Sequence, residues 1–352
     1  MDDTLTILED SVGRLWKNAV DPRSTLAAEQ AGFDGTAWAA LCKLGVIGLE
    51  APLSMPELAV VMGSIGEAGA LVPFVDSEAI GRWLANGAGF KAVDDIMTVV
   101  VVDPAAVGSK KGQDAVRLSI RNRVVPWAGC ARKLLFSFCV GDSHRVALKN
   151  IDDVKLNPAA NLAREPHGVV LDEAIDLAAG EMREVGLEYR PEQVMQRGAL
   201  CRSIQMLGAM MRVNELTLQY SHDRKQFKRA LADFQTIQSY LVIMAGELSA
   251  TSVLIDNAVE KFGQEDSFEH VAAARIRAGQ ASRQITSLGH QVHGAFGFTQ
   301  EAPLNIWTRR LWAWREEYGT EADWSDWLGE RTIERGADTL WTHITKPVRS
   351  DD

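Results

Sequence analysis

The change of hydrophobic period along the chain constrains its fold more than any other feature. From about residue 192 onward, apolar residues recur at intervals of three and four, as at Phe234, Ile237, Leu241, Met244 and Leu248. This is the spacing of one face of an α-helix. Between residues 96 and about 190, the apolar residues are instead β-branched or alternate with polar ones. Such a chain must place long helices beside a smaller sheet.

The segment from residue 96 to about 190 predicts several short strands. Residues 96–102 form a β-branched run, and residues 116–121 alternate between apolar side chains and arginine or serine. Residues 134–140 and 169–171 are further short apolar stretches, and prolines separate them. Strands of this length with period-two alternation favour a small antiparallel β-domain.

The first 93 residues read as helical. Ser54 and Glu57 have the spacing of a capping box with a proline at the start of a helix. Residues 36–43 predict a short helix that stops at Gly45. We therefore expect a mainly helical α+β protein. Its parts would be an N-terminal helical domain (residues 1–93), a central antiparallel β-domain (94–190) and a C-terminal antiparallel four-helix bundle (191–352).

Composition excludes several classes of function. The 352 residues carry a net charge of −10, which argues against a general nucleic-acid binder. We found no apolar run that approaches the roughly 20 residues of a membrane span, and the acidic N-terminus does not resemble a signal peptide. A cytoplasmic protein is therefore expected. The four cysteines form no CxxC pair, so neither a zinc site nor a disulfide framework is indicated.

Three short stretches could carry chemistry. In the first, Arg224-Lys225-Gln226-Phe227 follows a long helical segment. Cations there could simply complement the helix dipole. Alternatively, Arg224 could make a two-pronged contact to a phosphate, with Phe227 against a flat ring.

The second stretch is His290 to Thr299, where a helix should end. Gly294 could be a plain helix stop, or its turn could expose backbone amides to an anion. His290 and His293 lie three residues apart and could share a helix face, but no third metal ligand accompanies them, and no metal is expected.

The third stretch holds Glu316 and Glu317 among aromatic residues. Such carboxylates could supply a base with a raised pKa, although a solvated helix end is the more common arrangement. Gly63, Gly66 and Gly69 lie inside a helical run, so they do not indicate a Rossmann site.

Together these stretches resemble the acyl-CoA dehydrogenase family. Residues 220–238 resemble its "Y…R-x-x-F-G…F-Q-x-I-Q" signature, and residues 291–299 resemble "Q-x-H-G-G-x-G-F-T". The segment FDGTAWAALCKLGVIGLEAP is similar to the family's opening helix.

The resemblance implies FAD as the cofactor. Arg224 would contact its pyrophosphate, Phe227 would lie against it, and Gln235 would hydrogen-bond it. Gln291 and the Gly294 turn would meet the adenosine end, usually of a neighbouring subunit's FAD, which implies an oligomer.

The resemblance also implies a reaction, the introduction of a Cα–Cβ double bond into an acyl-CoA, with a carboxylate as base. The family's usual glutamate precedes "G-T", but here Tyr318 precedes Gly319, so Glu317 is the candidate base. Another base position known in the family falls near Gly198 and Ala199, which bear no carboxylate.

Further departures from the family pattern are Lys228 and Ala295, which stand where glycines are usual. The losses are similar to those in short bacterial members that assemble into heteromeric complexes on steroid or other bulky acyl-CoA thioesters. The chain would then be either a dehydrogenase with its own base or a non-catalytic partner that completes the FAD site. Its expected partners are an acyl-CoA, other copies or a larger homologous subunit in a heterotetramer, and an electron-transfer acceptor.

Overall fold

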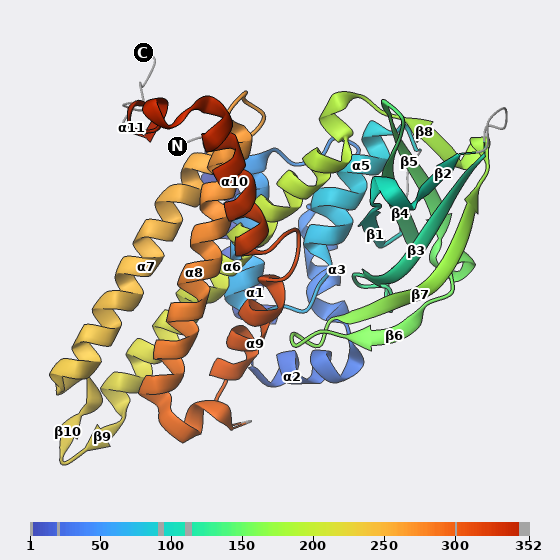
Figure 1. The fold of residues 1–352 in the computed structure, drawn as a ribbon. Coiled ribbons are helices and arrows are strands. Elements are labelled where there is room, and N and C mark those ends of the chain that lie inside the picture. Colours follow the sequence, from blue (N-terminus) through green and yellow to red (C-terminus); the bar gives the residue numbers. More distant parts are fainter. Residues whose placement is uncertain (1–2, 20–21, 91–94, 110–114, 300, 345–352) are drawn as a thin grey trace.

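The computed structural model describes residues 3–19, 22–90, 95–109, 115–299 and 301–344, in which helices come first, then strands, then helices again (Figure 1). The mainly helical α+β class predicted from the sequence is confirmed. The expected boundary between residues 93 and 94 lies outside the described residues. The first helices are α1 Asp3–Ala19, α2 Pro22–Ala31, α3 Gly35–Leu44, α4 Met55–Ala68, the π-helix η1 Val75–Arg82 and α5 Trp83–Gly87.

Local sequence signals set the ends of the early helices. Ser54 and Glu57 form the predicted capping box at the start of α4, with the Ser54 hydroxyl oxygen accepting from the Glu57 amide. The predicted helix over residues 36–43 is α3, which ends at Gly45 in the left-handed conformation, with φ of 79°. Asp34 caps its other end by accepting a hydrogen bond from the Ala37 amide.

In the described part of the chain, the first eight strands form two four-stranded sheets, in the orders β1-β4-β5-β8 and β2-β3-β7-β6. Strand β1 pairs with β4 in parallel, whereas the other pairings in these two sheets are antiparallel. The expected antiparallel β-domain is thus correct apart from this pair. The chain leaves β1 for the second sheet before it returns as β4, and such a long crossover permits a parallel pair. The strands are β1 Met97–Val101, β2 Val107–Ser109, β3 Val116–Val125, β4 Lys133–Val140, β5 Ser143–Asn150, β6 Asn157–Ala160, β7 Pro166–Leu177 and β8 Met182–Glu184.

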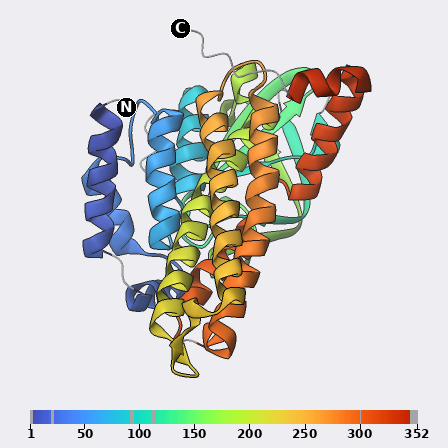
Figure 2. The ribbon, with the colours of Figure 1, turned by 90° about the vertical axis from the view of Figure 1, so that its left-hand side faces the viewer.

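Long helices form the remainder of the molecule. Helices α6, α7 and α8 run side by side (Figure 2), and α4 lies against α6. The later elements are α6 Pro191–Asp223, the hairpin strands β9 Lys225–Gln226 and β10 Arg229–Ala230, α7 Gln235–Glu260, α8 Ser267–His293, the turn η7 Gly294–Phe298, α9 Leu304–Trp314, α10 Glu321–Arg335 and α11 Leu340–Ile344.

Glycines allow α4 and α6 to touch along their backbones. A Cβ atom on Gly66 would lie 2.0 Å from the carbonyl oxygen of Gln205, and one on Gly208 would lie 2.0 Å from that of Gly63. No side chain fits at these positions. The glycines inside this helical run therefore serve helix packing.

Helix α7 corrects one expectation from the sequence. It is long and apolar enough, by length and composition, to cross a membrane, so the statement that no apolar run approaches a span is wrong. Only 22% of its most apolar window is buried in this chain. Val242 and Val253, for example, are 71% and 64% exposed. Helix α7 thus presents apolar side chains on the outside of the bundle.

Candidate functional site

Two cavities border α9, one beside each end of the helix. The first, of about 870 Å³, lies between α2, α8, η7 and α9 and is named here the α8–α9 pocket. The second, of about 560 Å³, is named the sheet–bundle cleft. Strands β1 and β3 line one side of this cleft, and the start of α6 and the turn between α9 and α10 line the other.

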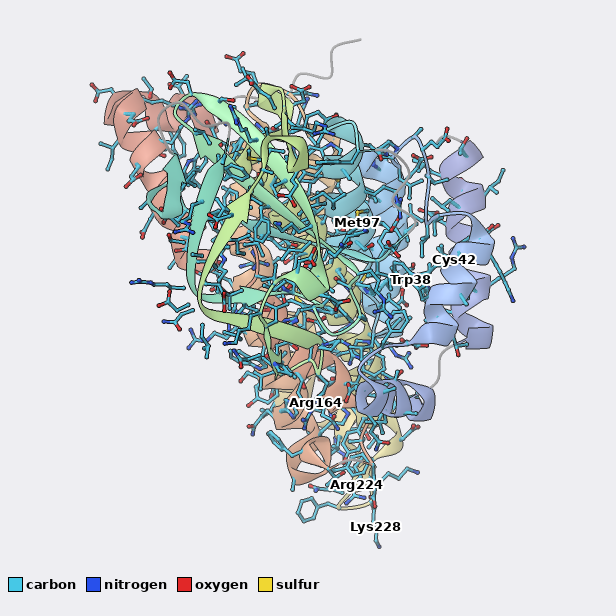
Figure 3. All side chains as sticks on the ribbon, turned by 90° about the vertical axis from the view of Figure 1, so that its right-hand side faces the viewer. Trp38, Cys42, Met97, Arg164, Arg224 and Lys228 are labelled. Atoms are coloured by element: carbon cyan, nitrogen blue, oxygen red, sulfur yellow. The ribbon has the colours of Figure 1, made fainter. Side chains whose placement is uncertain are left out.

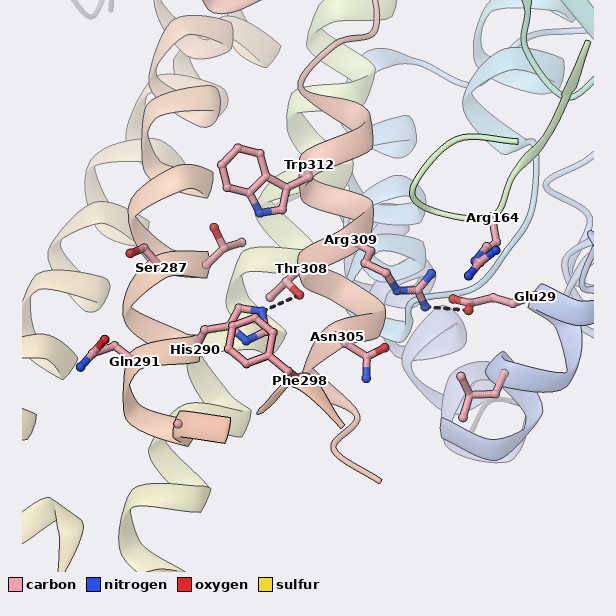
Figure 4. A pocket seen from close by; sticks show the side chains of 13 residues that line it. Glu29, Arg164, Ser287, His290, Gln291, Phe298, Asn305, Thr308, Arg309 and Trp312 are labelled. Atoms are coloured by element: carbon pink, nitrogen blue, oxygen red, sulfur yellow. Dashed lines mark hydrogen bonds and ion pairs between the residues drawn. The ribbon is translucent and has the colours of Figure 1, made fainter. Parts of the chain in front are cut away.

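The α8–α9 pocket contains two of the residues predicted from the sequence, Gln291 and Gly294 (Figure 4). Gly294 has φ of 59° and ψ of −146°, a conformation that only glycine adopts readily. A Cβ atom at this position would meet nothing within 4 Å. The backbone of the turn therefore faces open space and can be approached closely by a ligand.

Polar and aromatic side chains complete this pocket. His290 Nε2 lies 3.0 Å from the Thr308 hydroxyl, and the Phe298 ring stacks on the His290 ring with centroids 4.3 Å apart. Arg309 pairs with Glu29 of α2 at 2.7 Å. A lining that combines rings, a guanidinium and a bare turn suits a nucleotide-like ligand better than an acyl chain.

The two histidines at the end of α8 do not form a metal site. His293 Nδ1 donates to the Gly289 carbonyl at 2.9 Å, and its ring stacks on Tyr220 at 4.3 Å. His290 instead points to Thr308. Burial lowers the pKa of both imidazoles, which keeps them neutral.

The other predicted cofactor residues lie on a hairpin at the end of the bundle. Arg224 and Lys228 mark this tip in Figure 3, and Phe227 is 87% exposed. Gln235, at the start of α7, is also exposed. Lys228 adopts a left-handed φ of 65°, which explains why glycine would suit that position. None of these residues lines the α8–α9 pocket, so a single chain does not bring the predicted set together.

The sheet–bundle cleft has a mainly apolar sheet side, formed by Val99, Val101, Val124 and Pro126. Trp127 does not line the cleft. Its side chain is 1% exposed and belongs to a small cluster with Ala28 and Leu71 of the N-terminal region. The sheet side of the cleft is therefore mainly apolar, without the Trp127 indole over it.

Glu317 lines the helical side of the cleft and is held by Arg202. An Arg202 Nη atom lies 2.5 Å from a Glu317 carboxylate oxygen and 3.1 Å from Asp76. Burial raises the pKa of Glu317 to about 8; Arg202 opposes this increase, and the carboxylates of Asp76 and Glu165 add to it. Burial thus favours the protonated form of the Glu317 carboxyl, whereas the Arg202 guanidinium favours its charged form.

Tyr318 occupies the position directly before Gly319-Thr320. Its hydroxyl donates to Asp76 Oδ1 at 2.5 Å, and burial, with Asp76 beside it, raises the pKa of the phenol. Asp76 and Arg202 were missed as site residues in the sequence analysis. A signal existed for Asp76, because Asp76, Glu78 and Arg82 interrupt an otherwise apolar stretch and are all buried.

Arg275 fixes the turn that carries Glu317 and Tyr318. Its buried guanidinium donates to the main-chain carbonyls of residues 314, 315, 317 and 319, at 2.7 to 3.1 Å. Desolvation lowers its pKa to about 10. The charged side chain of Arg275 on α8 thus holds the backbone of this turn in place.

Glu165, His167 and Glu317 place ligand-type atoms within 4.8 Å of one another. His167 Nδ1 accepts from the Trp127 amide at 3.1 Å, so its neutral ring carries the proton on Nε2, 3.9 Å from Glu165. That nitrogen is a donor here, and the Arg202 guanidinium already meets the Glu317 carboxyl. The arrangement is a buried hydrogen-bonded cluster and does not favour a metal ion.

Comparison with known proteins identifies the fold and the C-terminal domain. Residues 185–322 match the family model "Acyl-CoA dehydrogenase, C-terminal domain". Over 103 residues, the chain is 33% identical to 3-sulfinopropanoyl-CoA desulfinase of Paraburkholderia xenovorans, which covers 29% of this chain and 26% of the relative. The chain thus spans about a quarter of the length of this curated relative.

Solved structures match over nearly the whole chain. The ChsE4-ChsE5 complex from Mycobacterium tuberculosis has a TM-score of 0.84 at 19% identity and covers 95% of this chain and 98% of its own. The Tcur3481-Tcur3483 steroid ACAD also has a TM-score of 0.84, at 21% identity, with coverage of 95% and 99%. Residues 185–322 thus form a C-terminal acyl-CoA dehydrogenase domain, and the whole chain shares the fold of these solved structures.

Proposed function

We propose that this chain is a subunit of a FAD-dependent acyl-CoA dehydrogenase, which introduces a Cα–Cβ double bond into an acyl-CoA thioester. The observation that carries the proposal is the sheet–bundle cleft. Its mainly apolar sheet side faces a turn that bears Glu317 and Tyr318. A planar ring between these sides would lie beside ionisable groups that are shielded from water.

Residues of the sheet–bundle cleft and residues of the α8–α9 pocket suit two different parts of FAD. The sheet side, with Val99, Val101 and Pro126, suits the apolar part of a flat ring. In the α8–α9 pocket, the Gly294 turn presents bare backbone and Gln291 offers an amide, as a sugar or phosphate requires. Bound FAD would supply the acceptor for the hydride that leaves the β-carbon.

The hairpin supports an assembly that shares its cofactor sites. Arg224 and Phe227 are exposed at the end of the bundle, and a guanidinium and an aromatic ring are groups that suit a diphosphate and a flat group. We place these side chains, with Gln235, Gln291 and Gly294, at the FAD of a neighbouring subunit. The exposed apolar side of α7 supports the same contact between subunits.

The catalytic base of the assembly has two candidate sources, this subunit or a homologous one. In the first, Glu317 removes the α-proton of the thioester; it lines the cleft, and a pKa of about 8 lies close to the working range of a base. In the second, a homologous subunit supplies the base and this chain completes the FAD site and the assembly. The 2.5 Å contact of Glu317 with Arg202 favours the second, because a carboxyl held this way is not free to meet a substrate.

The substrate class and the partner are proposed from similarity. The Tcur3481-Tcur3483 protein is described as a steroid ACAD, and ChsE4-ChsE5 is a complex of two different subunits. We propose a bulky, steroid-like acyl-CoA, a larger homologous subunit in a heterotetramer, an electron-transfer acceptor and a cytoplasmic location. A homo-oligomer is the alternative assembly.

Co-purification with the homologous subunit tests this function. The complex should be yellow and should reduce an artificial electron acceptor when an acyl-CoA is added. A complex without flavin under every condition would exclude the proposal. Replacing Glu317 by Gln then separates the two candidate sources of the base. A rate within a few-fold of wild type assigns the base to the partner, and a loss of several orders of magnitude assigns it to Glu317.

A further inference from the structure

Tyr318 lines the sheet–bundle cleft and fills the space next to Gly198 of α6. A Cβ atom on Gly198 of α6 would lie 2.2 Å from Cδ1 of the tyrosine ring, so the ring rests directly on the bare helix backbone. No gap remains there between α6 and the turn that carries residue 318. The Tyr318 ring therefore fills the space that a side chain at residue 198 would occupy.

Hydrogen bonds fix the tyrosine in this position. Its hydroxyl donates to Asp76 at 2.5 Å, and the indole Nε1 of Trp324 donates to its main-chain carbonyl at 2.9 Å. Asp76 is fully buried in η1 and also bonds Arg202, which is 2% exposed. Freeing the phenol would leave a buried carboxylate with one partner fewer, which is costly.

The backbone at Tyr318 adopts an unusual conformation. Its φ is 53°, a left-handed conformation that is uncommon for a bulky residue. Arg275 holds this turn through the carbonyls on both sides of residue 318. The surrounding contacts thus maintain a strained residue whose ring covers α6 at Gly198.

We propose that Tyr318, seated on Gly198 and bound to Asp76, closes the acyl end of this chain's own cleft, so that acyl-CoA binds only in the cleft of a partner subunit. This inference rests on the proposed function and assigns turnover to the partner. The cleft of about 560 Å³ then serves the flat ring on its sheet side, and no acyl chain passes between Tyr318 and α6.

Counting thioester sites tests the inference. Butanoyl-CoA is titrated calorimetrically into the flavin-loaded complex of this chain with its homologous subunit, and the bound molecules per complex are counted. We expect the wild-type complex to bind only as many as it has partner subunits. Tyr318→Ala should add about one site per copy of this chain, whereas Tyr318→Phe, which keeps the ring, should add none.

Two results would overturn the inference. One is a wild-type complex that already binds one thioester per copy of every subunit, a count that requires no variant to fold. The other is a folded, flavin-containing Tyr318→Ala complex that gains no site. Both leave the proposed function intact because the complex holds flavin. Failure of the proposed function would instead appear as a complex without flavin.

Discussion

The ring of Tyr318 lies against the backbone of Gly198, and a Cβ atom at residue 198 would come within 2.2 Å of it. The two residues are 120 positions apart, and the resemblance places the family's catalytic carboxylate either at residue 318 or near Gly198 and Ala199. In this chain, residue 198 is a glycine, which has no side chain, and the phenol ring of Tyr318 fills the space beside it. Neither residue bears a carboxylate, and the ring of Tyr318 packs on the backbone at Gly198.

This contact predicts that Gly198→Ala destabilises the chain. The ring cannot retreat, because its hydroxyl is bonded to Asp76 and its turn is held by Arg275. Overpacking of this kind costs about 1–3 kcal/mol in the free energy of unfolding, measured by denaturant titration. Gly13→Ala is the matched control, since a Cβ atom there meets nothing within 4 Å and α1 should tolerate it. Equal effects of the two variants would contradict the close contact.

Glu317 predicts a dependence of stability on pH. Its pKa rises from 4.5 to about 8 on folding, so between these values the native chain holds a proton that the unfolded chain has released. The free energy of unfolding should therefore fall as the pH rises from about 5 to 8. In Glu317→Gln, which cannot ionise, this fall should be smaller. Denaturant titrations of both proteins at several pH values measure the difference, and identical slopes would refute the raised pKa.

Arg275 is expected to be a large contributor to stability. In Arg275→Leu, the carbonyls around residues 314–319 lose their buried donor, and each unpaired carbonyl costs about 1–3 kcal/mol. The free energy of unfolding should fall by roughly 3 kcal/mol or more. The 314–320 segment should also become sensitive to limited proteolysis, while Arg277→Leu on the same helix should leave that segment protected. Unchanged protease resistance in Arg275→Leu would show that the turn holds without the guanidinium.

Arg224 is predicted to act only in the assembled protein. Arg224→Ala should weaken flavin binding by roughly ten- to a hundredfold, the value of one charge-assisted hydrogen bond. The folding of the isolated chain should be unaffected, because the residue lies exposed at the tip of the hairpin. Fluorescence of released flavin after dialysis measures retention, with Lys225→Ala as the control for lost charge. If both variants lose flavin equally, general charge at the hairpin is responsible and a specific contact is excluded.

The fold could be predicted because each helix and strand follows from a pattern within a short stretch of sequence. Periods of three to four in the helices, alternation in β3 and the capping box at Ser54 are all local signals, and the structure contains each of them. The turn around Gly294 was also visible, because its glycine spacing marks a helix end. The parallel pairing of β1 with β4 was missed, because pairing depends on where distant strands meet.

The candidate site could be predicted only in part. Tyr318 and Asp76 are 242 positions apart, and no local pattern indicates that they meet. Nor did the sequence reveal that Arg202 would hold Glu317, since the first is an ordinary charged residue of a helix and the second lies in a distant turn. Arg224 and Gln291 do not line one pocket in the single chain, so their predicted joint role depends on the proposed assembly.

The flavin absorbance of purified protein tests the central claim most directly. The chain is expressed alone and together with its larger homologous subunit, and bound flavin and acyl-CoA turnover are measured on both preparations. The account predicts little or no flavin and no turnover from the chain alone, and a yellow, active complex when the two are expressed together. A chain that is yellow and fully active by itself would contradict the account.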